Sequence, residues 1–309
     1  MANPLDRAIV RLLPTVPKQV VKRIADRYIA GTELEDACRV VKQVNEEGKS
    51  ATIDVLGEEI TTPDEARAIA GTYDHVFDTI ARQHLDSNVS VKLTALGLKL
   101  DHELCVANLQ TVVAHAAESS NFVRIDMEDS SCTEATLRIY RELRGRGYDN
   151  LGIVLQAYLR RTLADVDALA DLTPNVRLCK GIYVEPPQVA FQEFGEVRAN
   201  FVAALDALLA RGSYVGIATH DEWLVDEALR LVERRGLAHD EYEFQMLLGV
   251  RGERGDELVR AGHRLRIYVP FGEHWYPYSL RRLQENPRIA GYIAADTLRR
   301  LVRGRNGVA

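Results

Sequence analysis

A stripe of chemically active side chains lies near the carboxyl end of the sequence, in the segment YSLRRLQEN (278–286). Its members fall at positions i, i+3, i+4 and i+7, and so share one face of a predicted helix: Tyr278, Arg281, Arg282 and Glu285. Two guanidinium groups held side by side suit a carboxylate or a phosphate, which arginine binds through its planar fork. The alternative is a charged helix face that points to solvent.

Polar residues also stand at the ends of the β-branched runs that recur along the chain. The runs cover residues 51–57, 88–94, 122–128, 151–157, 176–182, 214–220, 242–247 and 264–270. The polar residues at or just after their ends are Glu58, Lys92, Thr94, Asp126, Glu128, Gln156, Arg177, Lys180, Thr219, His220, Gln245 and Tyr268. Any one of them has a simple alternative as a solvated or salt-bridged strand end. Together they predict a large polar ligand, because an enclosed charge must be paired.

The elements that position these residues read as strand and helix in alternation. The eight runs recur about every 32 residues, the usual length of a βα unit. Near-continuous apolar strands indicate a parallel sheet that is buried on both faces. The sequence therefore predicts an α/β fold of the (βα)8 TIM-barrel type, with its active site at the carboxyl ends of the strands.

A doubly wound open sheet is the alternative fold. It would place a glycine-rich fingerprint at its first strand-to-helix turn. The nearest such pattern is Gly145-Arg146-Gly147, which follows a helix-like segment and precedes a strand. That context is wrong for a dinucleotide fingerprint, so any dinucleotide would bind in another way.

The first 48 residues are predicted to be helical. Gly31 separates two apolar-periodic stretches, and Gly48 ends the second, as glycine often does at a helix carboxyl end. We therefore predict two parts, a helical arm over residues 1–48 and a single catalytic barrel over residues 49–309.

Composition excludes several classes of protein. The chain carries 39 Lys and Arg against 45 Asp and Glu, and a net charge of −6 argues against nucleic-acid binding. No apolar run approaches the roughly 18–20 residues that span a bilayer. The segment MANPLDRAIVRLLPTVPKQ has charges and prolines where a signal peptide is apolar, which predicts a cytoplasmic protein. No C-x-x-C, H-x-H or H-E-x-x-H spacing occurs, so no metal site is predicted.

Eight motifs, in one order along residues 50–286, resemble those of the proline dehydrogenase family. They are VSVKLTALG (89–97), RIDMED (124–129), LQAYLRR (155–161), VRLCKGIY (176–183), IATHD (217–221), EFQMLLGVR (243–251), IYVPFG (267–272) and YSLRRLQEN (278–286). The resemblance implies a flavin-binding barrel that uses FAD to oxidise L-proline to Δ1-pyrroline-5-carboxylate, the first step of proline catabolism to glutamate. Electrons would then pass to a membrane quinone.

The resemblance also implies the short monofunctional bacterial type. The bifunctional relatives carry a further aldehyde dehydrogenase part of several hundred residues, for which a chain of 309 residues has no room. We therefore expect the product to pass to a separate pyrroline-5-carboxylate dehydrogenase.

The family motifs imply a set of substrate-binding residues. The substrate carboxylate would be bound by Lys92, Arg281 and Arg282, and the proline ring would lie between Tyr268 and Tyr278. Asp126 would hydrogen-bond within this cationic group, and Glu58 would pair with Arg281 when the site is empty. Because the hydroxyproline-preferring relatives tend to lose the tyrosine of the IYVPFG motif, Tyr268 predicts a preference for proline over trans-4-hydroxyproline.

A second set of residues is implied as contacts of FAD. These are Met127, Gln156, Arg177, Lys180, Gly181, Ile182, Thr219, His220, Gln245 and Glu285. Hydride would leave C5 of proline for N5 of the flavin, so the cofactor carries the chemistry and the protein supplies position and field. A guanidinium such as that of Arg177 near N5 would stabilise the negative charge of the reduced flavin.

The end of the chain is basic and amphipathic over residues 298–305, with the sequence LRRLVRGR. Such a segment lies readily on anionic lipid, which would give peripheral contact with the inner face of the cell membrane. The alternative is a solvated helix end with cations near its carboxyl terminus.

Three functions of other kinds remain open from the residues alone. One is a Schiff-base aldolase that uses Lys92 or Lys180. Another is a metal-dependent hydrolase built on Asp126, Glu128 and His220. The third is an amino-acid sensor that has the same pocket and no catalytic activity.

Overall fold

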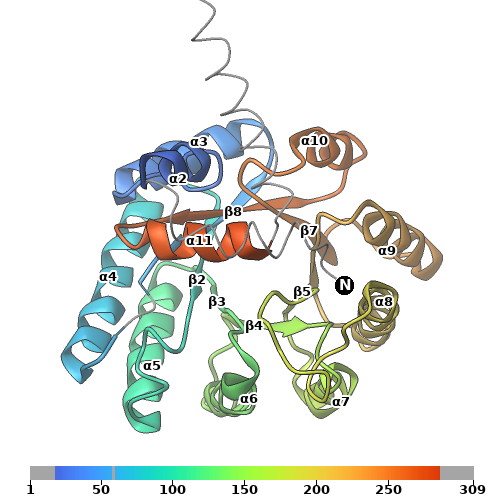
Figure 1. The fold of residues 1–309 in the computed structure, drawn as a ribbon, viewed down its shortest axis with the longest axis horizontal. Coiled ribbons are helices and arrows are strands. Elements are labelled where there is room, and N and C mark those ends of the chain that lie inside the picture. Colours follow the sequence, from blue (N-terminus) through green and yellow to red (C-terminus); the bar gives the residue numbers. More distant parts are fainter. Residues whose placement is uncertain (1–17, 58–59, 286–309) are drawn as a thin grey trace, which may run out of the picture.

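The computed structural model describes residues 18–57 and 60–285, in which strands and helices alternate (Figure 1). The strands are β1 (Ser50–Val55), β2 (Ser87–Val91), β3 (Val123–Ile125), β4 (Leu151–Gln156), β5 (Val176–Cys179), β6 (Val215–Ala218), β7 (Tyr242–Leu247) and β8 (Leu265–Phe271). The helices are α2 (Lys18–Ala25), α3 (Leu34–Glu46), α4 (Pro63–Arg82), α5 (His102–Glu118), α6 (Ser130–Gly145), α7 (Thr162–Ala168), the short 3-10 helix η2 (Ala170–Leu172), α8 (Phe194–Ala210), α9 (Glu222–Arg235), α10 (Gly252–Arg260) and α11 (Trp275–Glu285).

The eight strands form one closed parallel barrel. Each strand pairs with the next in chain order, and β8 pairs with β1 to close the sheet. Every β-branched run of the sequence overlaps one of these strands, so the predicted (βα)8 barrel is confirmed and the open doubly wound sheet is wrong.

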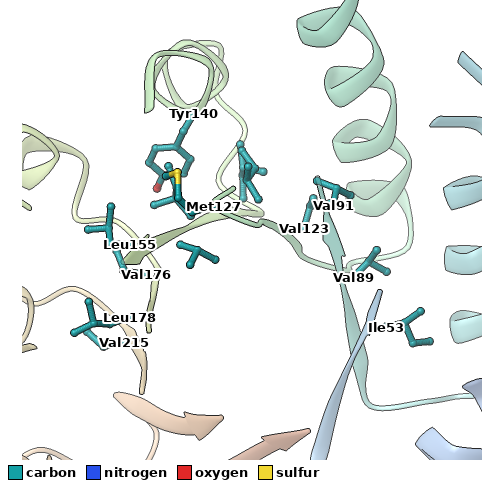
Figure 2. Packing of buried hydrophobic residues seen from close by; sticks show 14 of the residues in the cluster. Ile53, Val89, Val91, Val123, Met127, Tyr140, Leu155, Val176, Leu178 and Val215 are labelled. Atoms are coloured by element: carbon teal, nitrogen blue, oxygen red, sulfur yellow. The ribbon is translucent and has the colours of Figure 1, made fainter. Parts of the chain in front are cut away.

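The outward face of the strands is apolar and packs against the surrounding helices (Figure 2). Buried aliphatic residues stand at every second position along a strand, as in Val89 and Val91 of β2 and in Val176 and Leu178 of β5. Tyr140 of α6 is also fully buried in this layer. Because each large apolar side chain contributes about 1.5–3 kcal/mol when it is buried, this layer is the main source of the barrel's stability.

The inward face of the strands is polar, unlike the branched aliphatic interior of most barrels. Side chains from strands that are not neighbours meet here: Arg177 of β5 reaches Gln245 of β7, and Tyr268 of β8 reaches Asp126 just after β3. Contacts between non-adjacent strands must cross the inside of the barrel. The interior is therefore a network of charges and hydrogen bonds.

Two helices, one before the barrel and one after it, complete the fold around β1 and β8. The helix α3 packs on the outside of β1 and β8, and its apolar residues Ala37, Cys38 and Val41 join the main core. The helix α11, which follows β8, instead packs against α2, and its Tyr278 belongs to a small apolar cluster that includes Leu56 just after β1. In the view of Figure 1, α11 crosses the middle of the barrel. It thus lies at the carboxyl ends of the strands, where the site was predicted.

The glycine predicted to end the second helix does so. Gly48 follows α3 with φ +74°, a left-handed conformation that glycine adopts without strain.

The division of the chain into an arm and a barrel at residue 48 stays a prediction. Within residues 18–57 and 60–285, none of the helices combines the length and the apolar character that a bilayer-spanning segment needs.

Candidate active site

An ionic cluster around Asp126 occupies the carboxyl end of the barrel. Its Oδ1 accepts a hydrogen bond from Nη1 of Arg177 at 2.7 Å, and its Oδ2 accepts one from the Tyr268 hydroxyl at 2.7 Å. Nζ of Lys92 lies 3.8 Å from the same Oδ2. One carboxylate thus gathers three residues that the sequence assigned to the site, from three other strands or strand ends.

Lys92 is bound more closely by a second carboxylate. Its Nζ lies 2.6 Å from Oδ1 of Asp54, and both side chains are buried. Burying a charge is costly unless it is paired, so Asp54 stabilises the Lys92 ammonium in place. The two cations Lys92 and Arg177 are therefore balanced by the two carboxylates Asp54 and Asp126. These four side chains together carry no net charge.

Tyr268 is held in its neutral form. Burial raises the pKa of its hydroxyl well above the usual range, and the neighbouring charge of Asp126 raises it further. The hydroxyl is thus a permanent hydrogen-bond donor to Asp126. The Tyr268 ring also lies against the Arg177 guanidinium, whose Cζ is 5.1 Å from the ring centroid.

Arg177 is fixed by three residues, two of them on the strands β2 and β7 and the third just after β3. Besides Asp126, its Nε donates to Oε1 of Gln245 at 2.5 Å and its Nη1 donates to Oγ of Ser90 at 3.1 Å. A planar guanidinium bound on several edges has one orientation.

Gln156 carries an unsatisfied acceptor. Its Nε2 donates to the carbonyl oxygen of Met127 at 3.3 Å. Its Oε1 is buried and has no hydrogen-bond partner among the residues that the structure describes. A buried polar atom of this kind is costly unless something binds it, so the N–H group of a bound molecule is the natural partner.

The loop after β5 is shaped by a glycine. Gly181 has φ +101°, and a Cβ at this position would lie 2.0 Å from Cδ1 of the Tyr158 ring. Its neighbour Lys180 places Nζ 3.5 Å from Oδ2 of Asp221, and Ile182 is 41% exposed. These residues lie apart from the Asp126 cluster, on the rim that follows β5 and β6.

His220 joins the ends of β6 and β7. Its Nε2 accepts a hydrogen bond from the backbone N–H of Leu247 at 2.9 Å, so in the neutral ring the proton is on Nδ1. Oγ1 of the preceding Thr219 accepts from the backbone N–H of Asp221 at 3.1 Å. Both contacts shape the rim beside Lys180.

Several predicted site residues, or their side chains, lie outside the part of the chain that the structure describes. Glu58 is outside the described residues, and so are the side chains of Arg281, Arg282 and Glu285, although all three belong to α11. Tyr278, on the preceding turn, is buried in a small apolar cluster with Ala25, Ile29 and Leu56. The basic segment 298–305 also lies outside the described residues.

Sequence reasoning missed Asp54 and Ser90, which complete the cluster. A signal was present, because Thr52 and Asp54 are polar residues two apart in the otherwise apolar run ATIDVLG. Ser90 and Lys92 show the same spacing in the next run. In a strand this period places both side chains on one face, and in a barrel that face is the interior.

The arrangement favours binding and orienting a polar molecule. No three His, Cys, Asp or Glu side chains in the described part of the chain are grouped so as to hold a metal ion. Lys92 is in an ion pair with Asp54, whereas a Schiff-base lysine attacks as a neutral amine.

Comparison with known proteins decides the family. The family model described as proline dehydrogenase matches residues 37–294. The chain belongs to the proline dehydrogenase family. The predicted resemblance is thereby confirmed, and the protein is an oxidoreductase of proline catabolism.

Individual relatives show the same likeness. The chain is 39% identical to proline dehydrogenase 1 of Bacillus subtilis subsp. natto over 276 residues, which are 89% of this chain and 91% of that protein. It is 35% identical to the proline dehydrogenase of Deinococcus radiodurans over 286 residues, which are 91% of this chain and 92% of that one.

A solved relative has the same barrel. It is proline utilization A (PutA) from Bdellovibrio bacteriovorus, inactivated by N-propargylglycine, with a TM-score of 0.82 and 26% sequence identity. The match covers 90% of this chain but only 36% of that much longer one.

Proposed function

We propose that the protein oxidises L-proline to Δ1-pyrroline-5-carboxylate with FAD as its resident cofactor, and that the electrons pass to a membrane quinone. The observation that carries this proposal is the cluster in which Asp126 binds Arg177 and Tyr268 beside Lys92. Such a cluster holds a tyrosine ring and two cations in fixed positions at the mouth of the barrel.

The residues around this cluster suit FAD. The buried Oε1 of Gln156 has no partner in the described part of the chain, and the flavin ring offers an N–H between two carbonyl groups that would satisfy it. The donors of Arg177 and the exposed rim formed by Lys180, Gly181 and Ile182 suit a long anionic dinucleotide. When bound, FAD supplies the hydride acceptor, taking hydride from C5 of proline at N5.

The protein's own part is to bind, orient and provide an electrostatic field. Tyr268 forms a wall for the proline ring, and its hydroxyl is fixed by Asp126. Arg177 presents a guanidinium whose direction is set by Asp126, Gln245 and Ser90, which would stabilise the charge that develops on a reduced flavin. Holding the substrate in one orientation lowers the barrier by several kcal/mol.

The carboxylate of proline is bound mainly by α11 in this proposal. Lys92 and Arg177 are already balanced by Asp54 and Asp126, so surplus positive charge must come from another element. Arg281 and Arg282 lie on α11, three and four residues after the buried Tyr278. This requirement for a carboxylate would also reject simple amines.

The remaining partners follow from the same reaction. We propose that the basic segment 298–305 gives peripheral contact with the inner face of the membrane, where a quinone is reached. We also propose that a separate pyrroline-5-carboxylate dehydrogenase takes up the reactive product.

An anaerobic visible spectrum of the purified protein tests the reaction. We expect a flavin band that bleaches when L-proline is added and persists when pyrrolidine, which lacks the carboxylate, is added at the same concentration. A flavin band that ignores L-proline would overturn the substrate. The absence of a flavin band after reconstitution with FAD would overturn the cofactor.

A further inference from the structure

The hydrogen bonds of Arg177 continue away from the active site, through the inside of the barrel. Gln245 accepts from Arg177 with Oε1 and donates from Nε2 to Oε1 of Glu243 at 2.6 Å. The same Glu243 oxygen accepts from Nε of Arg266 at 2.8 Å. Glu243 and Gln245 are both buried. The proposed function uses Gln245 only as a predicted contact of FAD, and it gives Glu243 no role.

The order of donors and acceptors along this chain permits only one orientation of Gln245. A guanidinium has donors and no acceptor, and an ionised carboxylate has acceptors and no donor. The amide of Gln245 must therefore turn its oxygen to Arg177 and its NH2 group to Glu243. If the amide were flipped, its NH2 group would face the N–H of Arg177, and that hydrogen bond would be lost.

Glu243 is held in its ionised form, in which both of its carboxylate oxygens can only accept hydrogen bonds. Burial raises the pKa of Glu243, but the charge of Arg266 and the hydrogen bonds from Arg266 and Gln245 outweigh it, so the pKa lies below its usual value. Arg266 and Glu243 also line a polar cavity of about 560 Å³. Since Ser87, Asn175 and Tyr214 of its wall begin or precede strands, this cavity lies at the amino-terminal end of the barrel.

The neighbouring strand leaves room for this arrangement. Gly216 of β6 pairs with Glu243 and would carry a side chain toward the barrel interior. A Cβ at this position would lie 2.3 Å from Nε2 of Gln245. The glycine thus allows the bent position in which Gln245 spans Glu243 and Arg177.

We propose that Glu243 is a positioning residue of the enzyme: as an acceptor it sets the direction of the Gln245 amide, which in turn sets the Arg177 guanidinium against Asp126. The role of Arg177 beside the flavin rests on the proposed function. In this proposal Glu243 acts through two hydrogen bonds, from Gln245 to Glu243 and from Arg177 to Gln245, and has no contact of its own with substrate or cofactor.

The test separates the direction of the hydrogen bond from the buried charge. Glu243→Gln keeps a carbonyl oxygen that the donor Arg266 turns toward Gln245, so this variant should retain the wild-type rate of flavin reduction by proline while it loses stability. The double variant Glu243→Met with Arg266→Met removes acceptor and charge pair together, which buried ion pairs often tolerate without loss of stability. Its flavin reduction should be slower by roughly 10-fold to 100-fold.

Two further variants serve as an independent route and as a control. Gly216→Ala displaces Gln245 while every charge stays in place, and it should slow flavin reduction in the same way. Asp165→Asn removes a buried carboxylate of α7, outside the barrel interior, that pairs with Arg161. It should lower the melting temperature and leave the flavin unchanged.

The measurements use the holoenzyme and do not depend on turnover alone. The midpoint potential of the bound flavin, titrated with dithionite, should become more negative in the double variant and in Gly216→Ala, because a misplaced guanidinium stabilises the reduced flavin less. A wild-type potential and reduction rate in both variants would overturn the proposal, and so would a Glu243→Gln variant as slow as the double one. Failure of wild-type protein to respond to proline would overturn the proposed function instead, and the potentials would still decide the role of Glu243.

Discussion

Tyr268 and Asp126 are 142 residues apart in the sequence, and the Tyr268 hydroxyl donates a 2.7 Å hydrogen bond to Oδ2 of Asp126. The other oxygen of Asp126 accepts from Arg177. Asp126 therefore ties the tyrosine proposed as a wall for the proline ring to the guanidinium proposed for the flavin. In the proposed function, this one carboxylate would couple the position of the substrate to that of the cofactor.

Replacing Tyr268 tests both its hydroxyl and its ring. Tyr268→Phe removes one hydrogen bond to a charged group and should lower kcat/KM for proline by about tenfold. Tyr268→Ser opens space and adds a small polar group, so it should shift the ratio of kcat/KM values toward trans-4-hydroxyproline. Tyr242→Phe is the matched control, because this tyrosine lies away from the site. Its hydroxyl is 2.8 Å from Nδ1 of His263. A wild-type enzyme that prefers hydroxyproline would contradict this account of Tyr268.

Lys92 should matter for both stability and substrate binding. Lys92→Met removes the cation that lies 2.6 Å from the buried Asp54, and breaking a buried ion pair costs about 3–5 kcal/mol. Urea unfolding should show that loss, and the KM for proline should rise. Lys99→Met, which removes an exposed lysine from the same loop, should change neither quantity. Equal unfolding free energies of Lys92→Met and Lys99→Met would show that the ion pair between Lys92 and Asp54 does not stabilise the fold.

Arg281 tests the placement of α11 over the site. If the surplus charge for the substrate carboxylate comes from this helix, Arg281→Ala should raise the Kd for proline by roughly 100-fold, the effect of losing a charge-assisted contact of about 3 kcal/mol. Flavin content should stay normal. Arg230→Ala, on the exposed face of α9, is the control. Unchanged proline affinity in Arg281→Ala would refute the placement.

Two glycines with similar backbone conformations can be used to separate the cost of backbone strain from the effect of a steric clash with a neighbouring side chain. Gly181 has φ +101° and faces the Tyr158 ring, whereas Gly147 has φ +92° and nothing within 4 Å of an added Cβ. Both Gly→Ala variants should lose about 1–2 kcal/mol of stability from the left-handed backbone. Only Gly181→Ala should also weaken FAD binding, with a Kd for FAD at least about tenfold higher. The fluorescence of the freed flavin measures this Kd. Equal FAD affinities would remove the 180–182 loop from the cofactor site.

The charge of Glu243 predicts a pH dependence of stability. Its folded pKa lies below the usual value, so the unfolded chain binds its proton first as the pH falls. Glu243 therefore stabilises the fold fully above pH about 4.5, and this contribution disappears as the pH falls through the folded pKa. The difference in unfolding free energy between wild type and Glu243→Gln should be largest near pH 7 and shrink in acid. A difference that does not vary between pH 7 and pH 3 would show that folding does not lower the pKa of Glu243, and a difference that grows in acid would show that Glu243 is protonated in the fold.

Much of the barrel follows from local sequence. Each β-branched run of six or seven residues yielded a strand, because short runs of this kind between polar segments favour the extended form. Polar residues that break these runs at a spacing of two, such as Lys92 and Tyr268, already indicated the inner face. The family motifs assigned them roles that the residue types alone left open.

Tertiary structure alone decided which of these residues meet. Asp126 contacts Arg177 and Tyr268 only because the sheet closes, with β8 paired to β1, and closure depends on the register of all eight strands. The same closure buried Asp54 against Lys92 and aligned Glu243, Gln245 and Arg177 across the interior. It also left the outside of β1 and β8 to α3, which freed α11 to lie at the mouth. Local periodicity reflects burial of near neighbours, whereas these contacts join residues that only the closed barrel brings together.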